Sequence, residues 1–270
     1  MRLKDKVAVI TGAGAGIGSS IAQAFAREGA KVICSSRRAS NVNAVAETIL
    51  AAGGEAVAIQ CDVSAEDDVK RLVQATLEKY GRLDVLVNNA GVNYVKEFEG
   101  VTPSDWDRVI NTDLRGTYLC SWYAIPQMIR QGMGSIINIT SVHTLACLPG
   151  AAPYDAAKWG VVGLTKSMAV EFAARNIRVN ALSPGLIDTQ IWDDIKNAAP
   201  DLHECLDYWR SNIPMGRVGT PAEIASLAVF LASDEASYVT GANIVADGGM
   251  TSQLISQASF KSESLEGVKR

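Results

Sequence analysis

The chain has 270 residues, of which 48% are hydrophobic and 20% charged, and its formal net charge is −4. This length fits one α/β domain, and a globule of this size buries roughly 70–75% of its unfolded surface, so it needs neither disulfides nor a metal ion to stay folded. No segment is rich enough in Lys and Arg to bind a polyphosphate backbone, and we therefore expect no nucleic-acid partner.

The cysteines and histidines exclude further classes. The five cysteines are scattered and never spaced as Cys-x-x-Cys, which favours a reducing compartment and argues against zinc. With only His143 and His203 available, we expect no metal site. A predicted strand follows Met1 too closely to leave room for a signal peptide, and the longest apolar runs are far too short to span a membrane. We expect a cytoplasmic protein with no membrane contact.

Short β-branched runs alternate with helix-length periodic segments from residue 7 almost to residue 250. The first helical segment shows the pattern, since Ile17, Ile21 and Phe25 recur at helical spacing. Nearly continuous apolar strands alternating with helices are typical of a parallel sheet covered on both faces, here a doubly wound, Rossmann-type α/β fold of about seven strands. Strands are predicted at 7–10, 31–34, 56–61, 84–88, 135–140, 177–182 and 243–246, and the longest helices at 104–130 and 154–174.

One domain accounts for residues 1–250, because no change in composition indicates a second. Residues 183–213 do not follow the alternation, and a loop of about thirty residues in a compact domain is usually a lid or a binding element. The tail 251–270 is polar and rich in Ser, Lys and Glu, so disorder is the simplest expectation. Contact of the tail with a neighbouring subunit is the alternative.

A glycine turn lies between the first strand and the first helix. Such a turn lets the backbone approach a pyrophosphate, which then binds at the helix N-terminus. The strict G-x-G-x-x-G pattern is not met, and the sequence instead fits G-x-x-x-G-x-G with Gly12, Gly16 and Gly18. A glycine-rich turn without a ligand is the alternative, but its place in the first βαβ unit favours a dinucleotide.

Four further residues are candidates for catalysis. Tyr154 and Lys158 lie four apart at the start of a helix, so their side chains share one face. Ser141 follows the fifth strand, at the carboxyl edge where ligands bind in open α/β sheets. Asn111 lies in the middle of the long helix. Taken singly, each has a structural explanation: chance spacing, a turn residue or a buried polar group.

Together with the glycine turn, these residues resemble the short-chain dehydrogenase/reductase family, in its subtype of about 250 residues. The resemblance extends from about Leu3 to Gly249. Its motifs occur in the order of the family: Thr11–Gly18, Asp62-Val63, Asn88-Asn89-Ala90-Gly91, Asn111, Ser141, Tyr154-x-x-x-Lys158 and Pro184-Gly185.

The resemblance implies NAD(P)-dependent hydride transfer between the cofactor and a secondary alcohol or carbonyl substrate. It implies that Tyr154 is the general acid/base, that Lys158 contacts the nicotinamide ribose and favours ionisation of the tyrosine, that Ser141 binds the substrate oxygen, and that Asn111 holds a water of the proton relay. It further implies a homotetramer in which helices 104–130 and 154–174 pair between subunits. The cofactor contacts that it implies are Gly12, Gly16, Ile17, Gly18, Asp62, Val63, Asn89, Ala90, Gly91, Tyr154, Lys158, Pro184, Gly185, Ile187 and Thr189.

Elementary electrostatics agrees with the tyrosine assignment. Using a free tyrosine as a base at neutral pH costs about 4 kcal/mol, and a positive charge ~5 Å away at an effective dielectric of ~20 supplies about 3 kcal/mol of this.

Two other classes of protein fit the sequence less well. A hydrolase using Ser141 and His143 would lack the G-x-S-x-G elbow. An inactive dinucleotide sensor would be expected to have lost Tyr154 or Lys158, and both are present.

The end of the second strand predicts NADP, with NAD as the alternative. In dinucleotide folds an acid about twenty residues beyond the glycines binds the ribose 2′-hydroxyl and repels a 2′-phosphate. That position is Ser36 here, followed by Arg37 and Arg38. A guanidinium binds phosphate through a bidentate fork. Ser36 and Arg37 are therefore predicted to bind the 2′-phosphate.

The substrate is less well specified. The predicted pocket wall comprises residues 93–95, residues 143–150 and the long loop, with Tyr94, His143 and Trp192 as substrate contacts. The aromatic and acidic side chains of the loop suit a sugar or polyol, unless the acids form a solvated face. The alternatives are a xenobiotic ketone or a 3-oxoacyl thioester, for which Arg130 and Arg175 would contact a carrier protein.

Overall fold

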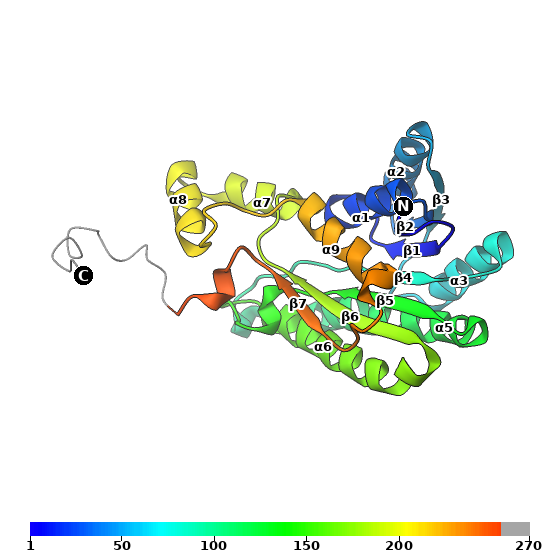
Figure 1. Ribbon diagram of the computed structural model, residues 1–270. Coiled ribbons are helices and arrows are strands. Elements are labelled where there is room, and N and C mark those ends of the chain that lie inside the picture. The colour runs from blue at the N-terminus through cyan, green and yellow to red at the C-terminus, as the bar shows by residue number, and fades with distance from the viewer. Residues whose placement is uncertain (255–270) are drawn as a thin grey trace, which may run out of the picture.

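The computed structural model describes residues 1–254, so most of the predicted tail lies outside the described residues. Seven parallel strands form one sheet in the order β3-β2-β1-β4-β5-β6-β7 (Figure 1). The order reverses between β1 and β4, which is where ligands bind in doubly wound sheets. The predicted Rossmann-type fold is confirmed. The strands are β1 Val7–Thr11, β2 Lys31–Ser36, β3 Glu55–Gln60, β4 Val85–Asn88, β5 Gly134–Ile139, β6 Ile177–Pro184 and β7 Asn243–Ala246.

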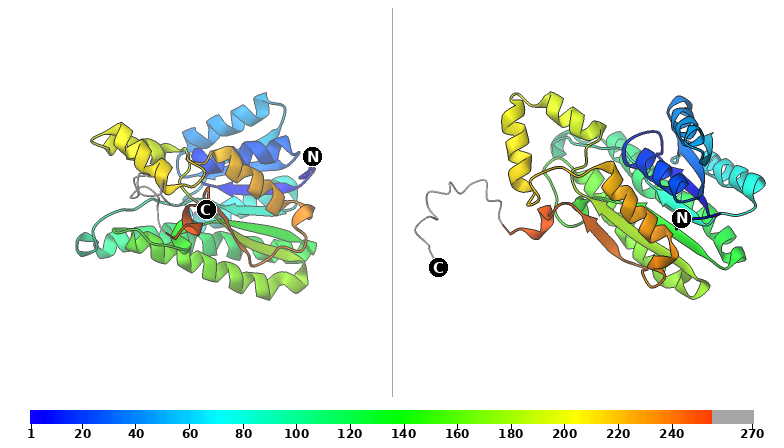
Figure 2. Two further views of the ribbon diagram at one scale, coloured as in Figure 1. Left: turned by 60° about the vertical axis from the view of Figure 1, so that its left-hand side comes forward. Right: turned by 45° about the horizontal axis from the view of Figure 1, so that its top comes forward.

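Helices cover both faces of the sheet (Figures 1 and 2). Successive side chains of β1 divide between the faces: Ala8 and Ile10 belong to one core, and Val7 and Val9 to the other. Both faces of the central strands β1, β4 and β5 are buried, which explains their nearly continuous apolar sequence. No helix in residues 1–254 is long and apolar enough to cross a bilayer. One face carries α1 Gly16–Arg27, α2 Ala39–Ala51 and α9 Pro221–Ala232, and the other carries α3 Glu66–Tyr80, α5 Gly116–Gln131 and α6 Ala152–Phe172.

The helix predicted at 104–130 is present but is not uniform. It consists of α4 Pro103–Val109, a π-helical segment Ile110–Arg115, and α5. Hydrogen bonds from residue i to i+5 widen the turn in a π-helix, and such segments are frequent at functional sites. The widened turn changes which side chains face the sheet, so the 3.6-residue period assumed from sequence does not hold here.

The prediction of an irregular loop at 183–213 is wrong. Most of this segment is helical, with α7 Gln190–Ala198 and α8 Leu202–Asn212. Asp201 caps α8 by accepting hydrogen bonds from the backbone N–H groups of His203 and Glu204, at 2.7 and 3.1 Å. The two helices, yellow in Figures 1 and 2, project beyond the carboxyl ends of the strands. We refer to α7 and α8 together as the lid.

Candidate active site

Three adjoining cavities follow the carboxyl edge of the sheet from β2 to the lid. The first cavity is lined by Arg37 and Arg38 at its outer end. Gly12 lines both this cavity and the second one. The second, the main cleft, has a volume of about 320 Å³ and also contains Lys158. Tyr154 lines both this cleft and the third cavity, of about 300 Å³, beneath the lid. Tyr154 therefore stands where an elongated cleft meets a compact pocket.

The glycine turn forms one wall of the cleft. Gly12 and Gly16 have φ angles of +66° and +53°, in the left-handed region that favours glycine. A Cβ at Gly18 would lie 2.4 Å from the side-chain nitrogen of Asn89, so only glycine lets this amide approach. Asn89 donates hydrogen bonds to the carbonyl oxygens of Thr11, at 3.0 Å, and of Gly12, at 3.2 Å. The loop after β4 thus fixes the conformation of the turn.

The N-terminus of α1 is open toward this cleft. Its N-cap, Ala15, offers no side chain to accept hydrogen bonds from the first N–H groups of the helix. The residues that carry those groups, Gly16, Ile17 and Gly18, line the cleft. Free N–H groups and the positive end of a helix dipole suit a pyrophosphate. The cleft therefore fits a dinucleotide, as the sequence predicts.

The far end of the cleft is basic. Ser36, Arg37 and Arg38 line it, and within the described chain no acid is among its wall residues. The hydroxyl of Ser36 donates to the carbonyl oxygen of Arg38 at 3.2 Å. Val63 lines this end as predicted, whereas the carboxylate of Asp62 accepts hydrogen bonds from the N–H and hydroxyl of Ser64 beside it, at 3.0 and 2.7 Å.

Tyr154 and Lys158 share one face of α6, as their spacing predicts. The Nζ of Lys158 lies 5.2 Å from the centroid of the Tyr154 ring and 3.4 Å from the carbonyl oxygen of Ile139, to which it donates. Ser141 lies two residues beyond β5, and its Oγ accepts a hydrogen bond from the N–H of His143 at 3.3 Å. Ser141 and Tyr154 line the same compact pocket, so the structure brings together three of the four predicted catalytic residues.

The structure places Asp113, rather than Asn111, against Lys158. Oδ2 of Asp113 lies 3.1 Å from Nζ of Lys158, and Asp113 lines the main cleft. Asn111 is half-buried, makes no side-chain hydrogen bond within residues 1–254, and is not among the residues that line the cleft. A relay role for Asn111 therefore has no support in this geometry. Sequence patterns do not single out Asp113, because it lies among the polar residues Asn111, Thr112 and Arg115.

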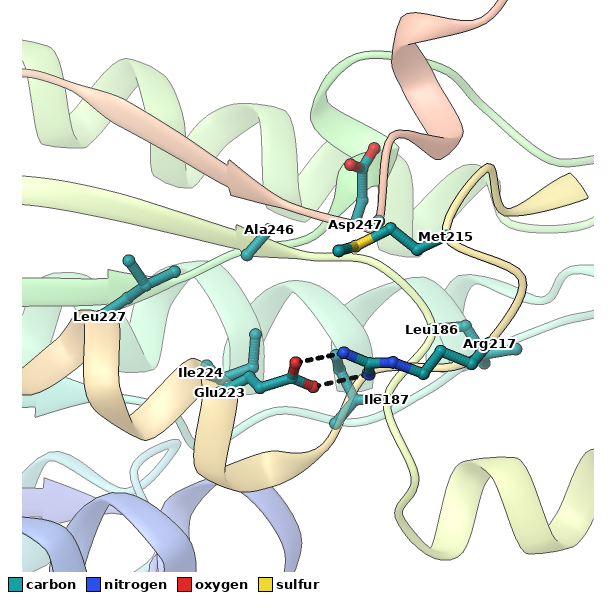
Figure 3. A pocket seen from close by; sticks show the side chains of 11 residues that line it. Leu186, Ile187, Met215, Arg217, Glu223, Ile224, Leu227, Ala246 and Asp247 are labelled. Carbon is teal, nitrogen blue, oxygen red and sulfur yellow. Dashed lines mark hydrogen bonds and ion pairs between the residues drawn. The ribbon is translucent and has the colours of Figure 1, made fainter. Parts of the chain in front are cut away.

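The segment after β6 divides between two cavities. Thr189 lines the main cleft close to Gly16, where a Cβ on the glycine would lie 3.3 Å from Cγ2 of Thr189. Gly185 lines the pocket beneath the lid, and Pro184 ends β6. The side chain of Ile187 lines a separate cavity instead, which is shown in Figure 3. A cofactor contact through the side chain of Ile187 is therefore not supported by its position.

The cavity in Figure 3 lies where the chain returns from the lid to α9. Two of its charged groups pair with each other: Arg217 donates to both carboxylate oxygens of Glu223, at 3.0 and 2.7 Å, and Glu223 also accepts from the N–H of Thr220 at 2.7 Å. The third, Asp247, accepts hydrogen bonds from the N–H and hydroxyl of Thr251, at 2.8 and 2.7 Å. These bonds from Arg217 and Thr220 lower the pKa of Glu223 to about 2. Thr220 and Glu223 form a capping box at the start of α9. We assign these contacts a structural role, which is to hold the segment between the lid and α9 in place.

The pocket beneath the lid has one polar end. Ser141, His143 and Tyr154 lie there, with Tyr94 also in the wall. Most of the remaining wall is apolar. The lid contributes Trp209 to it, whereas Trp192 is buried inside the lid with Nζ of Lys196 5.6 Å from its ring centroid. Trp209, not Trp192, is thus the aromatic residue of the lid that lines the pocket. The apolar residues are Val95, Val142, Leu148, Pro149, Ala151, Leu186, Ile191, Ile195 and Met250.

A dinucleotide cleft that ends at a Tyr–Lys pair on a Rossmann sheet defines a nicotinamide-dependent oxidoreductase. The chain belongs to the short-chain dehydrogenase/reductase family. Residues 12–251 match the family model described as enoyl-(acyl carrier protein) reductase. The protein is an NAD(P)-dependent oxidoreductase that acts on CH–OH or C=O groups.

Individual relatives agree with this family. The chain is 42% identical over 250 residues to a 3-oxoacyl-(acyl-carrier-protein) reductase of Thermotoga maritima, covering 93% of this chain and 99% of that protein. An actinorhodin polyketide ketoreductase variant with NADPH has a TM-score of 0.89 at 32% identity, covering 92% of this chain and 98% of the other. Levodione reductase has a TM-score of 0.89 at 35% identity, covering 93% and 99%.

Proposed function

We propose that the protein is an NADP-dependent reductase of a compact, uncharged ketone, with the corresponding secondary alcohol as product. The observation that carries this proposal is the position of Tyr154, between the cleft that ends at Arg37 and a pocket of about 300 Å³. A pocket of this size is at the lower end of the range for small-molecule sites. It suits a small molecule better than a long chain.

The preference for NADP rests on the basic end of the cleft. The 2′-phosphate would lie against Ser36 and the exposed guanidinium of Arg37, with Arg38 adding positive charge. The polyketide ketoreductase with a similar fold binds NADPH, which supports a preference for NADP. The pyrophosphate would lie on the N-terminus of α1, and the nicotinamide end near Lys158 and Thr189.

The chain supplies the proton and the orientation of the substrate. The nicotinamide, when bound, supplies the hydride for reduction and accepts it in oxidation. Tyr154 would donate its phenolic proton to the carbonyl oxygen of the substrate, and would take the proton from the alcohol in the reverse direction. Ser141 would hold that oxygen by a hydrogen bond. Lys158 places positive charge beside the tyrosine.

The polar end of the pocket favours a substrate with a second oxygen near the carbonyl, a class that includes small sugars and polyols. His143 lies in the pocket wall beside Tyr154 and would contact such an oxygen. The acids of the lid do not contribute, because none of them is among the described residues that line the pocket, and Asp193 pairs instead with Lys196 at 2.9 Å. The sugar or polyol proposal therefore rests on His143 and Ser141 rather than on these acids.

A thioester on a carrier is the second candidate, favoured by the Thermotoga maritima relative and by the apolar part of the pocket wall. Charge argues against it. Residues 188–212 hold six acids and two bases, a balance that would repel a phosphate-bearing arm. Arg130 and Arg175 precede β5 and β6 and so lie at the amino edge of the sheet, opposite the pocket. They cannot position a carrier at its entrance.

A substrate panel followed by absorbance of the reduced nicotinamide tests the proposal. The panel contains small ketones with and without a neighbouring hydroxyl, sugars and polyols in the oxidative direction, and 3-oxoacyl groups on coenzyme A and on a short uncharged thiol. We expect the highest kcat/KM for a compact hydroxylated substrate with NADPH. A higher kcat/KM for the coenzyme A thioester than for every small substrate would establish the second candidate instead.

We also propose a homotetramer, built in part through α5 and α6. These helices expose large apolar side chains, with Trp122 59%, Trp159 50% and Val170 85% accessible in the single chain. Tyr118 stacks at a tilt beside Trp122, with ring centroids 5.9 Å apart. Apolar faces of this kind are typical of surfaces that a second copy covers, and closed symmetric association is usual for soluble oligomers.

A further inference from the structure

Asp113 and Lys158 form a buried ion pair within the main cleft. Oδ2 of Asp113 lies 3.1 Å from Nζ of Lys158, and the two side chains are 0% and 7% exposed. Oδ2 has no other polar partner within residues 1–254. Burial acts to lower the pKa of Lys158, but attraction by Asp113 and Tyr154 outweighs it, so the pKa lies above its ordinary value. Lys158 is therefore held as a cation whose nearest counter-charge is a carboxylate.

The surrounding backbone fixes the position of the carboxylate. Its Oδ1 accepts a hydrogen bond from the N–H of Val92 at 2.8 Å. Gly91 leaves room for the pair, because a Cβ there would lie 2.8 Å from Oδ2 of Asp113 and 3.4 Å from Nζ of Lys158. The carbonyl oxygen of Asp113 also accepts from the hydroxyl of Thr117 at 2.8 Å. The loop after β4 and the π-helical segment therefore hold the carboxylate against the lysine.

This placement has a consequence for the tyrosine. The carboxylate lies 3.1 Å from Nζ, and Nζ lies 5.2 Å from the Tyr154 ring centroid, so the carboxylate is at most about 8 Å from that ring. We propose that Asp113 is a positioning residue that offsets the charge of Lys158 and keeps Tyr154 protonated at neutral pH, which poises the site for carbonyl reduction. The proposal rests on the proposed reaction, in which Tyr154 donates a proton.

Other charged groups around Tyr154 are few. His143, on the 3-10 helix Val142–Thr144, has its ring centroid 5.2 Å from that of Tyr154 and pairs with Asp155 of α6. On α4, which also packs against α6, Asp105 pairs with Lys96 at 3.3 Å, and Asp107 and Arg108 are exposed. On β6, Arg178 donates to carbonyl oxygens near the amino edge of the sheet. Asp113 is the acid paired directly with Lys158.

The test is the ionisation of Tyr154 in the cofactor-free protein, read from tyrosinate absorbance. The titration of Tyr154→Phe is subtracted from that of the wild type, which isolates one tyrosine from seven. The same subtraction is made between Asp113→Asn and the double variant. A charge at most ~8 Å away at an effective dielectric of ~20 changes the midpoint by about 1–2 pH units, so we expect Asp113→Asn to lower it by this amount. Asp107→Asn, which removes an exposed acid, should leave it unchanged.

An unchanged or higher midpoint in Asp113→Asn would overturn the proposal. Asp113→Ser, also neutral and smaller, replaces this variant if circular dichroism shows that Asn is not tolerated. The wild type alone gives a second test, because a lysine without an offsetting acid would bring the midpoint about 2–3 units below that of free tyrosine. A wild-type midpoint below about pH 8 would also overturn the proposal. None of these readings depends on the substrate, so a wrong substrate class and a wrong role for Asp113 are distinguishable.

Discussion

Nδ1 of His143 lies 2.5 Å from Oδ1 of Asp155, and the ring of His143 stands edge-on to that of Tyr154 in the pocket wall. When His143 is neutral, this contact makes Nδ1 the donor and leaves Nε2 as a free acceptor. The ring can then accept a hydrogen bond from a hydroxyl group of the substrate. Asp155, which does not line the pocket, thus orients the His143 ring that does.

Replacement of His143 should therefore affect hydroxylated substrates selectively. His143→Phe keeps a ring but removes the acceptor, and we expect kcat/KM to fall about 10-fold for a hydroxylated substrate, the value of one hydrogen bond. For a matched ketone without the hydroxyl, kcat/KM should change less than about 3-fold. Asp155→Asn, which leaves the imidazole in place, should cause a smaller loss. Equal losses for both substrates would contradict a role in recognition.

Tyr154→Phe should abolish turnover and leave cofactor binding nearly intact, because only the transferable proton is removed. We expect kcat to fall by more than about 100-fold, within the usual range for an acid/base residue. The Kd for NADPH, from fluorescence titration, should change less than about 3-fold. Tyr94→Phe alters another tyrosine of the same pocket wall and should keep most of the activity. Activity above about a hundredth in Tyr154→Phe would exclude the assigned role.

Ser36→Asp should reverse the cofactor preference. A carboxylate at the end of β2 would accept from the ribose 2′-hydroxyl of NAD and repel the 2′-phosphate of NADP. A charged hydrogen bond is worth about 1.5–3 kcal/mol, so the ratio of kcat/KM for the two cofactors should change at least 10- to 100-fold. Arg37→Ala should lower kcat/KM for NADP and leave kcat/KM for NAD nearly unchanged. A wild type that prefers NAD would show that Ser36 and Arg37 do not bind a 2′-phosphate.

Trp122→Glu should disrupt the proposed tetramer, because it buries a charge in the apolar contact between α5 helices. Light scattering at micromolar concentration should show a tetramer for the wild type and a smaller species for the variant. Leu50→Glu is a matched control, since Leu50 is 52% exposed on α2, away from α5 and α6. A monomeric wild type would rule out the tetramer.

The ion pair between Arg217 and Glu223 should make lid anchoring depend on pH. The folded state holds the pKa of Glu223 near 2, below its ordinary value of 4.5, so the stabilisation is complete above pH 4.5 and is lost as the pH falls toward 2. Glu223→Gln should therefore lower Tm at pH 7, and the difference from wild type should shrink below pH 4.5. Glu47→Gln, on the exposed side of α2, should change Tm little at either pH. A constant difference across this range would contradict the assignment.

Local sequence patterns were sufficient for the parts of the protein that depend on neighbouring residues. The strands follow from β-branched runs, the glycine turn from Gly12, Gly16 and Gly18, and the shared face of Tyr154 and Lys158 from their spacing along one helix. The carboxyl edge of a parallel sheet then places Ser141 near them. These features are determined by short-range geometry and by the alternation of strand and helix.

The tertiary structure decided which side chains meet across elements. Asp113 contacts Lys158 and lines the main cleft, whereas Asn111, the residue that the family resemblance implied, does not, although both lie in the π-helical segment. Trp209 of α8 lines the pocket, whereas Trp192 of α7 is buried and does not. Such contacts join residues far apart in the chain, and their choice depends on the packing of whole elements, which no local pattern specifies.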